Sequence, residues 1–243
     1  MEDVQNSKPT EHISLNKVGI TDFDYPISIE RKGKSFDRIV NIQMSVDLPE
    51  HQKGAHMSRF IEEIEIPKKT HSIESLARRI GEGLLKKHDY AKNVEVKLST
   101  KMGYKKGKIA ELYGCYNGKQ KVGVTVHGNT TCPCAIEMTG GTSHNQRAKL
   151  KVLIESDEDV EVLDLIHLCE DSFSVPLEIK LKRKDEKELV EKMHSNPKFV
   201  EDVVRKCVSQ LKEKYPGKHC SVKATSMESI HPYNVFSEWE GTL

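Results

Sequence analysis

Pairs of strand-like segments alternate with amphipathic helix patterns along this sequence, and the same order recurs in both halves of the chain. In the first half, strand patterns cover Pro26–Arg31 and Phe36–Leu48, joined by turn residues 32–35 (Lys-Gly-Lys-Ser). A helix is expected after Ser72, whose hydroxyl suits an N-cap. Strand pairs followed by helices, twice over, predict an α+β fold of two related modules. The apolar residues of the first helix share one face: Ile73, Leu76, Ala77, Ile80 and Leu84.

The remaining segments continue this order. Val94–Ser99 alternates as a strand, and Asn117-Gly118 is a hairpin signal between strands at Lys108–Tyr116 and Gln120–Val126. Met227–Leu243 is expected to be irregular. The second half should contain a strand at Arg147–Ser156, then a helix beginning at Ser156 with Asp159 in its first turn and Val162, Ile166 and Cys169 facing inward. We then expect a strand at Val175–Lys182 and two helices, at Asp185–His194 and Pro197–Tyr215, with Asn196 as the cap of the second helix. The last expected strand is Val222–Thr225.

Composition narrows the class of protein. The 38 Lys and Arg residues nearly balance 37 Asp and Glu, so no net field favours nucleic acid or an anionic membrane. The polar first residues lack the apolar segment of a signal peptide, and no stretch approaches the roughly 18 apolar residues of a membrane span. Six cysteines in a chain of this length are best interpreted as reduced thiols. We therefore expect a cytoplasmic protein that binds neither nucleic acid nor membranes.

Two cysteines and a histidine lie close together in the middle of the chain. Cys132-Pro133-Cys134 follows an expected strand, and His144 opens the next one. Thiolate and imidazole are preferred ligands of zinc-like ions, and Gly140-Gly141 would let the loop fold back so that these groups converge. The spacing is not that of a zinc finger, so two buried thiols and a surface histidine remain an equal alternative.

Four segments together resemble the GTP cyclohydrolase type IB family: CPC with SHNQR, KGAHMSRF at Lys53–Phe60, Lys182–Arg205, and MESIHPY at Met227–Tyr233. They span about three quarters of the chain, in order. Ala135 and Ala148 stand where the family often has serine, which puts only local hydrogen bonds in doubt.

The resemblance implies a tunnelling fold made of two fused ββαα-type modules that assemble into an oligomeric barrel. After a flexible tail at residues 1–15, the modules would be residues 16–117 and 118–243, and the second would carry most metal ligands. We expect a homo-oligomer, with a tetramer as the leading expectation.

The resemblance also implies one divalent metal ion per site, Zn, Mn or Fe(II). Its ligands would be Cys132, His144, Glu186 and His231, which come from separate places and leave a position open, as catalytic sites do. The alternatives are a solvated acid at a helix start for Glu186 and a tail histidine without a role for His231.

The implied reaction converts GTP and water to 7,8-dihydroneopterin 3'-triphosphate and formate, the first step of pterin and tetrahydrofolate synthesis. Cys132 would act at the metal, His231 would move protons, and Glu228 would orient that imidazole or move protons itself. Cys134 would assist at the reacting carbon, although a packed structural thiol is nearly as good an interpretation.

Substrate-binding residues follow from the same motifs. Glu201 in FVED would accept hydrogen bonds from N1–H and the 2-amino group of guanine, and the alternative is an exposed helix acid. Candidates for the triphosphate are Ser58, Arg59 and Arg147, each of which could equally be a surface or interface residue.

Three rival functions remain open at this point. One is another tunnelling-fold purine or pterin enzyme, such as a pterin synthase or a nitrile reductase, and the latter would need a nicotinamide cofactor rather than this ligand set. A closer one is the archaeal-type cyclohydrolase, whose product is a cyclic phosphate. A non-catalytic zinc-stabilised binding module is the third, and it would unfold when its metal is removed.

Overall fold

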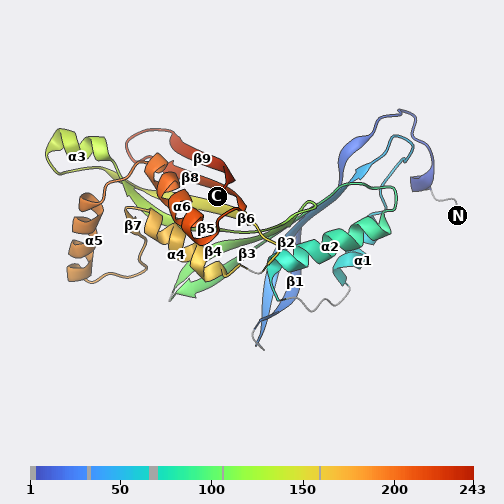
Figure 1. Cartoon of the computed structure of the whole chain (residues 1–243), viewed down its shortest axis with the longest axis horizontal. Helices are drawn as coiled ribbons and strands as arrows, with labels where there is room; N and C mark the ends of the chain where they lie inside the picture. The colour runs from blue at the N-terminus through green and yellow to red at the C-terminus, as the bar shows by residue number, and fades with distance from the viewer. Residues whose placement is uncertain (1–3, 32–33, 66–70, 106, 159) are drawn as a thin grey trace. The chain divides into compact units, whose positions relative to one another are not determined.

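The computed structural model describes residues 4–31, 34–65, 71–105, 107–158 and 160–243, without the side chains of Glu30, Arg31 and Lys34 (Figure 1). It divides into two compact units. The first holds Met1–Thr100, Tyr113–Val122 and Ser156–Asp159, and the second holds Lys101–Leu112, Gly123–Glu155 and Val160–Leu243. The expected module boundary at residues 117 and 118 stays a prediction.

The fold is α+β, as expected, and contains a large antiparallel sheet. Strands neighbour one another in the order β1-β2-β3-β4-β5-β6-β8-β9, and β7 pairs with β5. The strands are β1 (Leu15–Arg31), β2 (Lys34–Leu48), β3 (Val94–Lys105), β4 (Lys108–Tyr116), β5 (Gln120–Thr131), β6 (Asn145–Glu155), β7 (Val175–Pro176), β8 (His219–Met227) and β9 (Asn234–Thr242). The helices are α1 (Met57–Glu65), α2 (Ile73–Lys87), α3 (Pro133–Thr139), α4 (Val162–Ser172), α5 (Arg183–Ser195) and α6 (Val200–Lys214), with a 3-10 turn at Val4–Asn6. None of the described helices is long and apolar enough to cross a membrane.

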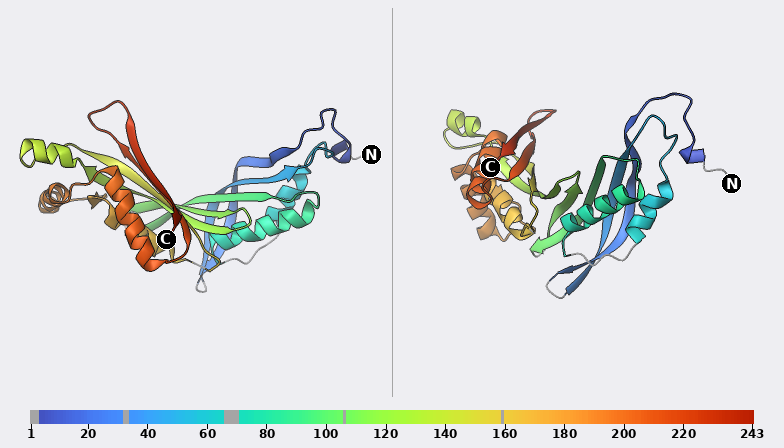
Figure 2. Two further views of the ribbon diagram at one scale, coloured as in Figure 1. Left: turned by 45° about the horizontal axis from the view of Figure 1, so that its top comes forward. Right: turned by 45° about the vertical axis from the view of Figure 1, so that its right-hand side comes forward.

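The core of the first unit lies between α2 and the strands β2 and β3. The Ser72 hydroxyl accepts a hydrogen bond from the Ser75 N–H at 3.2 Å, which confirms the expected start of α2. All five apolar residues of its predicted face are buried. Alternate residues of β2 from Val40 to Val46 are buried as well, so α1 and α2 cover one face of these strands (Figure 2).

The core of the second unit is built in the same way. Alternate residues of β6 from Ala148 to Ile154 are fully buried, and β6 pairs with β8. The helices α4 and α6 pack against each other and against these strands (Figure 2). Three free cysteines, Cys169, Cys207 and Cys220, are buried there.

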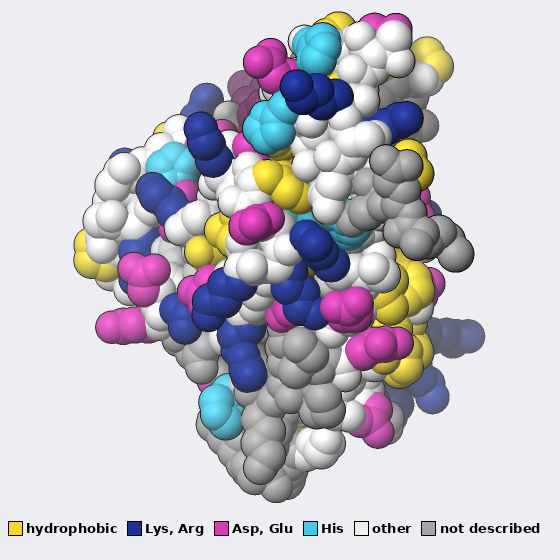
Figure 3. Space-filling model, turned by 90° about the vertical axis from the view of Figure 1, so that its right-hand side faces the viewer, with side chains coloured by type: hydrophobic (Ala, Val, Ile, Leu, Met, Phe, Trp, Pro, Cys, Tyr) yellow, Lys and Arg dark blue, Asp and Glu magenta, His cyan; other side chains and the backbone are white. Residues whose placement is uncertain are grey.

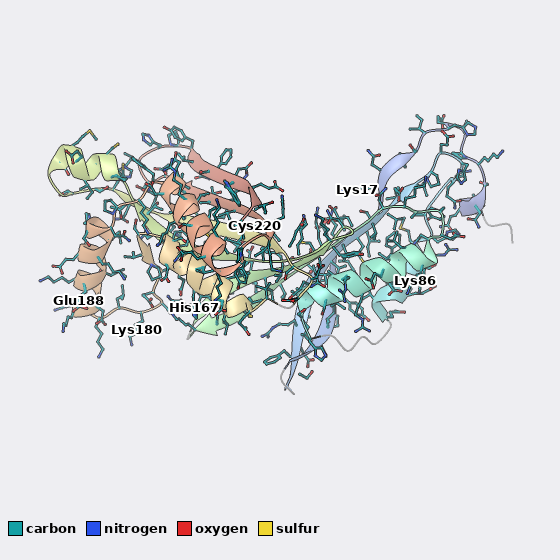
Figure 4. All side chains as sticks on the ribbon, viewed as in Figure 1. Lys17, Lys86, His167, Lys180, Glu188 and Cys220 are labelled. Carbon is teal, nitrogen blue, oxygen red and sulfur yellow. The ribbon has the colours of Figure 1, made fainter. Side chains whose placement is uncertain are left out.

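The expected strand at Val175–Lys182 is wrong beyond its first two residues. The chain leaves β7 at Pro176, and no described strand pairs with the residues that follow. The buried ammonium of Lys108 donates hydrogen bonds to Glu178 at 2.8 Å and to Glu170 at 2.9 Å, so Glu178 is held by an ion pair rather than by a sheet. Ile179 is 67% exposed, so the alternating pattern does not correspond to a buried face here. Figure 4 labels Lys180 on the segment that leads from β7 to α5.

Two helix starts differ from the sequence interpretation. The fourth helix begins at Val162 after Glu161. The Ser156 hydroxyl accepts from the Glu158 N–H at 3.3 Å ahead of this helix, and Asp159 lies outside the described residues. The last helix, α6, begins after Phe199, whose N–H donates to the Asp202 carboxylate at 3.0 Å. Asn196 instead follows α5, and its amide donates to the Ser174 carbonyl at 2.8 Å.

The expected irregular tail after Met227 is wrong, because Asn234–Thr242 forms β9 and pairs with all of β8. Two elements were also missed: the helix α1, and the helix α3 in the central loop. At the other end, residues 5–7 hydrogen bond to residues 52–55, for example from the Lys53 N–H to the Ser7 carbonyl at 3.0 Å. The turn residues 32 and 33 lie outside the described part.

A buried histidine makes the stability of the first unit depend on pH. His88 is 0% exposed, its Nδ1 lies 3.1 Å from the Leu84 carbonyl oxygen, and its ring packs 4.7 Å from that of Phe60. Burial lowers the pKa of His88, with the charge of Arg59 acting in the same direction.

A histidine with a depressed folded-state pKa stabilises the fold fully above its unfolded pKa, and the stabilisation is lost as the pH falls below about 6.5. We expect the melting temperature to fall more steeply between about pH 6.5 and 5 for the natural chain than for His88→Phe. Circular dichroism melts at constant ionic strength measure both slopes. Equal slopes would show that another group controls this acid sensitivity.

Candidate functional site

The central Cys-Pro-Cys segment forms the junction between β5 and a short helix. Cys132 is extended (φ −70°, ψ 116°) and precedes α3, which has Pro133 in its first turn. The helix ends at Gly140, whose φ of 72° is left-handed and therefore favours glycine. The loop that was expected to fold back thus contains one short helix, and it returns the chain to β6 at Asn145.

This return brings the backbones of Cys132 and His144 side by side, while the meeting of their thiol and imidazole groups stays a prediction. The Cys132 N–H donates to the His144 carbonyl at 3.3 Å. The Ser143 hydroxyl lies 2.9 Å from the Cys132 carbonyl oxygen and 2.7 Å from that of His144, which holds both backbones in place. Cys132 is partly exposed and Cys134 is exposed, so both thiols are accessible.

A side-chain contact orients the imidazole of His144. Its Nδ1 lies 3.0 Å from Oε1 of Gln146, two residues further along β6. Gln146 is buried, and its Nε2 donates to the Thr130 hydroxyl on β5 at 3.1 Å. The ring is therefore held from the Nδ1 side.

The other two expected metal ligands lie elsewhere in the second unit. Glu186 is exposed in the first turn of α5, the helix that also carries Glu188 (Figure 4). His231 is exposed on the β8–β9 connection and stacks on Tyr233, with ring centroids 5.1 Å apart. Glu228 is partly exposed on the same connection. Among the described residues, no three His, Cys, Asp or Glu side chains are grouped closely enough to hold a metal ion, so the four-ligand set stays a prediction.

A β-bridge connects Lys198, just before α6, with Thr131, the last residue of β5 and the neighbour of Cys132. The Lys198 N–H donates to the Thr131 carbonyl at 3.0 Å. Glu201 follows three residues later, exposed in the first turn of α6. The segment before the expected guanine anchor is therefore connected to the strand end next to Cys132, one of the four expected metal ligands, a link that the sequence did not reveal.

Sequence reasoning also missed Lys198 itself. Its ammonium donates to the Ser172 and Phe173 carbonyls at the end of α4, at 3.0 and 2.9 Å. Burial lowers the pKa of Lys198, and the nearby charge of Lys206 adds to this effect. The carbonyl groups at the end of a helix have no partner within the helix, and Lys198 supplies one here. The same residue forms the bridge to Thr131, so these bonds hold the bridge in place.

The three residues expected to contact the triphosphate belong to two elements, β6 and α1. Arg147 is exposed near the start of β6. Ser58 and Arg59 belong to α1 in the first unit, where Ser58 is exposed and a guanidinium nitrogen of Arg59 donates to the Lys87 carbonyl at 2.6 Å. Basic and acidic side chains are interspersed on the face in Figure 3, in keeping with the balanced composition.

Comparison with solved structures identifies the fold. Uricase from Arthrobacter globiformis, a protein of the tunnelling-fold family, matches with a TM-score of 0.52, and the match covers 94% of this chain and 93% of that one. Only 8% of the residues are identical, so this likeness concerns the fold alone.

Comparison of sequences identifies the family. "GTP cyclohydrolase FolE2" of Thermosipho melanesiensis is 36% identical over 100% of this chain and 99% of its own length. "GTP cyclohydrolase MptA" of Pyrococcus abyssi is also 36% identical, over 97% of this chain and 98% of its own length. The family model described as type I GTP cyclohydrolase folE2 matches residues 1–237. The chain therefore belongs to the type I GTP cyclohydrolase folE2 family.

Proposed function

We propose that this chain is a metal-dependent GTP cyclohydrolase of the cytoplasm that converts GTP and water to 7,8-dihydroneopterin 3'-triphosphate and formate. The observation that carries the proposal is the pairing of Cys132 with His144 at the β5–β6 return, next to the bridge that precedes Glu201. Family membership over nearly the whole chain supports the same activity. The dihydropterin product would enter pterin or tetrahydrofolate synthesis.

The donor chemistry fits one divalent ion, Zn, Mn or Fe(II). Cys132 and His144 supply a sulfur and a nitrogen from adjacent backbone, and the contact at Nδ1 leaves Nε2 of His144 for a metal. We propose that Glu186 and His231 complete the donor set in the assembled enzyme. When bound, the ion would lower the pKa of water toward neutrality, so that a hydroxide is available at the operating pH.

The reaction places defined demands on the protein side chains. Water must add at guanine C8, and N7 and N9 must be protonated as the five-membered ring opens and formate leaves. His231 and Glu228, three residues apart on one exposed connection, would carry these protons. The exposed Cys134 thiol, at the start of α3, would assist at C8.

The protein would recognise GTP at both ends of the nucleotide, the guanine base and the triphosphate. The Glu201 carboxylate can accept from N1–H and the 2-amino group together, and its place in the first turn of α6 leaves it exposed to a ligand. Arg147 would meet the triphosphate. Ser58 and Arg59 of α1 would supply further phosphate contacts.

We further propose that the chain forms a homotetramer whose modules close a tunnelling-fold barrel, with active sites where subunits meet. Light scattering should give four times the chain mass of 27.6 kDa. Dilution or a charge reversal that dissociates the assembly should lower activity in step with the mass, because the proposed site would then be incomplete. A fully active monomer would contradict this assembly.

The archaeal-type reaction is the second candidate, because MptA relatives match as well as FolE2 relatives do. The two products differ in their phosphates, a linear triphosphate against a cyclic phosphate. Phosphorus NMR of the reaction mixture distinguishes them directly.

The activity itself is tested by incubating the purified chain with GTP and, in separate reactions, Zn, Mn or Fe(II). We expect formate release and pterin fluorescence after oxidation with at least one of these ions. Absence of both products with every ion, in a folded protein that binds GTP, would overturn the proposed function.

A further inference from the structure

A chain of buried hydrogen bonds runs behind His144. It begins at Nδ1 of His144, 3.0 Å from Oε1 of Gln146, and continues from Nε2 of Gln146 to the Thr130 hydroxyl at 3.1 Å. The Thr130 hydroxyl lies 3.4 Å from the hydroxyl of Ser226. Thr130 and Ser226 are 1% and 2% exposed, so bulk water does not compete for the two contacts of the Thr130 hydroxyl, while the contact at His144 is partly buried.

The chain joins three strands next to the proposed metal centre. Thr130 is on β5, Gln146 on β6, and Ser226 on β8, where it pairs directly with Ala148. β8 ends one residue after Ser226, and the connection with Glu228 and His231 follows. The position of the Gln146 amide is thus fixed by its bond to Thr130 on β5, which in turn contacts Ser226 on β8.

The amide orientation decides which imidazole nitrogen carries the proton. An amide oxygen can only accept, so Oε1 facing Nδ1 requires a proton on Nδ1. In the neutral ring, Nε2 then has a free lone pair, which is the form that binds a metal. A reversed amide would donate to Nδ1 and leave the proton on Nε2, where it would block coordination.

We propose that Gln146 is the positioning residue of this site, because it selects the Nδ1–H tautomer of His144 and presents Nε2 to the divalent ion. Thr130 and Ser226 support it by fixing the amide in its buried slot. This inference rests on the proposed metal-dependent function, but the tautomer of His144 can be measured without metal.

Three variants separate positioning from simple packing. Gln146→Met keeps the length of the side chain and removes both amide groups. Gln146→Glu keeps an acceptor toward Nδ1, and the Thr130 hydroxyl can turn to donate to the second carboxylate oxygen. Gln120→Met is the matched control, since Gln120 is another buried glutamine and donates to the Ser156 carbonyl at 3.0 Å in the first unit.

The first measurement is the imidazole nitrogen NMR spectrum of the full-length, metal-free protein at a pH where the ring is neutral. We expect Nδ1–H for His144 in the natural chain, in Gln146→Glu and in Gln120→Met, and a mixture of tautomers in Gln146→Met. An Nε2–H tautomer in the natural chain would overturn the proposal, and so would an unchanged Nδ1–H signal in Gln146→Met.

The second measurement is Zn affinity by competition with a chelator dye. Gln146→Met should bind about 10- to 100-fold more weakly, the usual range for loss of such a partner. Gln146→Glu should recover most of the affinity, and Gln120→Met should retain it even if its melting temperature falls. Equal affinity of Gln146→Met and the natural chain would contradict the positioning role.

Two further outcomes are distinguishable. If the natural chain binds no divalent metal, the proposed metal-dependent function fails, while the tautomer measurement still decides the role of Gln146. If Gln146→Met does not fold, Thr130→Val removes only the hydroxyl behind the amide. It should partly mix the tautomers and weaken Zn binding by a smaller factor, and an unchanged tautomer and affinity would overturn the proposal.

Discussion

Cys132→Ala and His144→Ala should each abolish GTP turnover, with a loss of more than about 1000-fold, and should lower the bound metal. Each substitution removes one proposed donor from the β5–β6 return, and the remaining donors cannot replace it. Without the ion, water at neutral pH is a poor nucleophile toward C8, so binding of GTP alone does not restore the rate.

The measurements are elemental analysis of the purified variants and formate release under saturating GTP. Two substitutions at residues outside the proposed centre serve as controls, Cys115→Ala in β4 and His167→Ala on the exposed side of α4. Full metal occupancy and a normal rate in either site variant would refute the assigned centre.

Removal of the metal from the natural chain separates a catalytic from a structural role. Both cores are formed by apolar faces of helices and strands, so the circular dichroism spectrum should survive chelation while activity is lost. Cooperative unfolding on chelation would favour the zinc-stabilised binding module instead.

Glu201→Gln should lower kcat/KM for GTP by about 30- to 1000-fold while the metal is retained. The substitution replaces one acceptor with a donor that faces a guanine donor, and it removes a charge-assisted pair. The loss of both in a desolvated site costs roughly 2–4 kcal/mol. Steady-state kinetics and elemental analysis test the two halves of this expectation.

Inosine triphosphate provides an internal comparison, because it lacks the 2-amino group. It should be a poor substrate of the natural chain and should lose less on Glu201→Gln, since one of the two contacts is already absent. Glu213→Gln, an exposed acid near the end of the same helix, should have no effect. Unchanged kcat/KM for GTP would place the guanine anchor elsewhere, and loss of metal would place Glu201 among the ligands.

Elements whose apolar residues face a core were predictable from the sequence. The face of α2, the cap at Ser72, and the alternating strands β2 and β6 all carry their periodicity in the residues that become buried. The pairing of Cys132 with His144 was predictable for a similar reason. The two residues are only 12 positions apart, and a glycine-ended return can bring them together.

Two of the missed elements, β9 and α3, have little buried surface. β9 lies at the end of the strand order, and its residues are exposed or half-buried, so no buried face distinguishes it from an irregular tail. α3 has seven residues and none is buried. The sequence of α3 therefore contains no periodic set of buried apolar residues from which a helix could be predicted.

What the sequence by itself determined is the α+β class, most of the core faces, the family motifs and the local return that brings the backbones of Cys132 and His144 together. Only the tertiary structure decided which distant segments meet that pair. The bridge from Thr131 to Lys198 and the polar chain from Gln146 through Thr130 to Ser226 join residues 16 to 96 positions apart. Single hydrogen bonds of this kind leave no periodic trace in a sequence, because they depend on strand pairing and on buried geometry rather than on spacing along the chain.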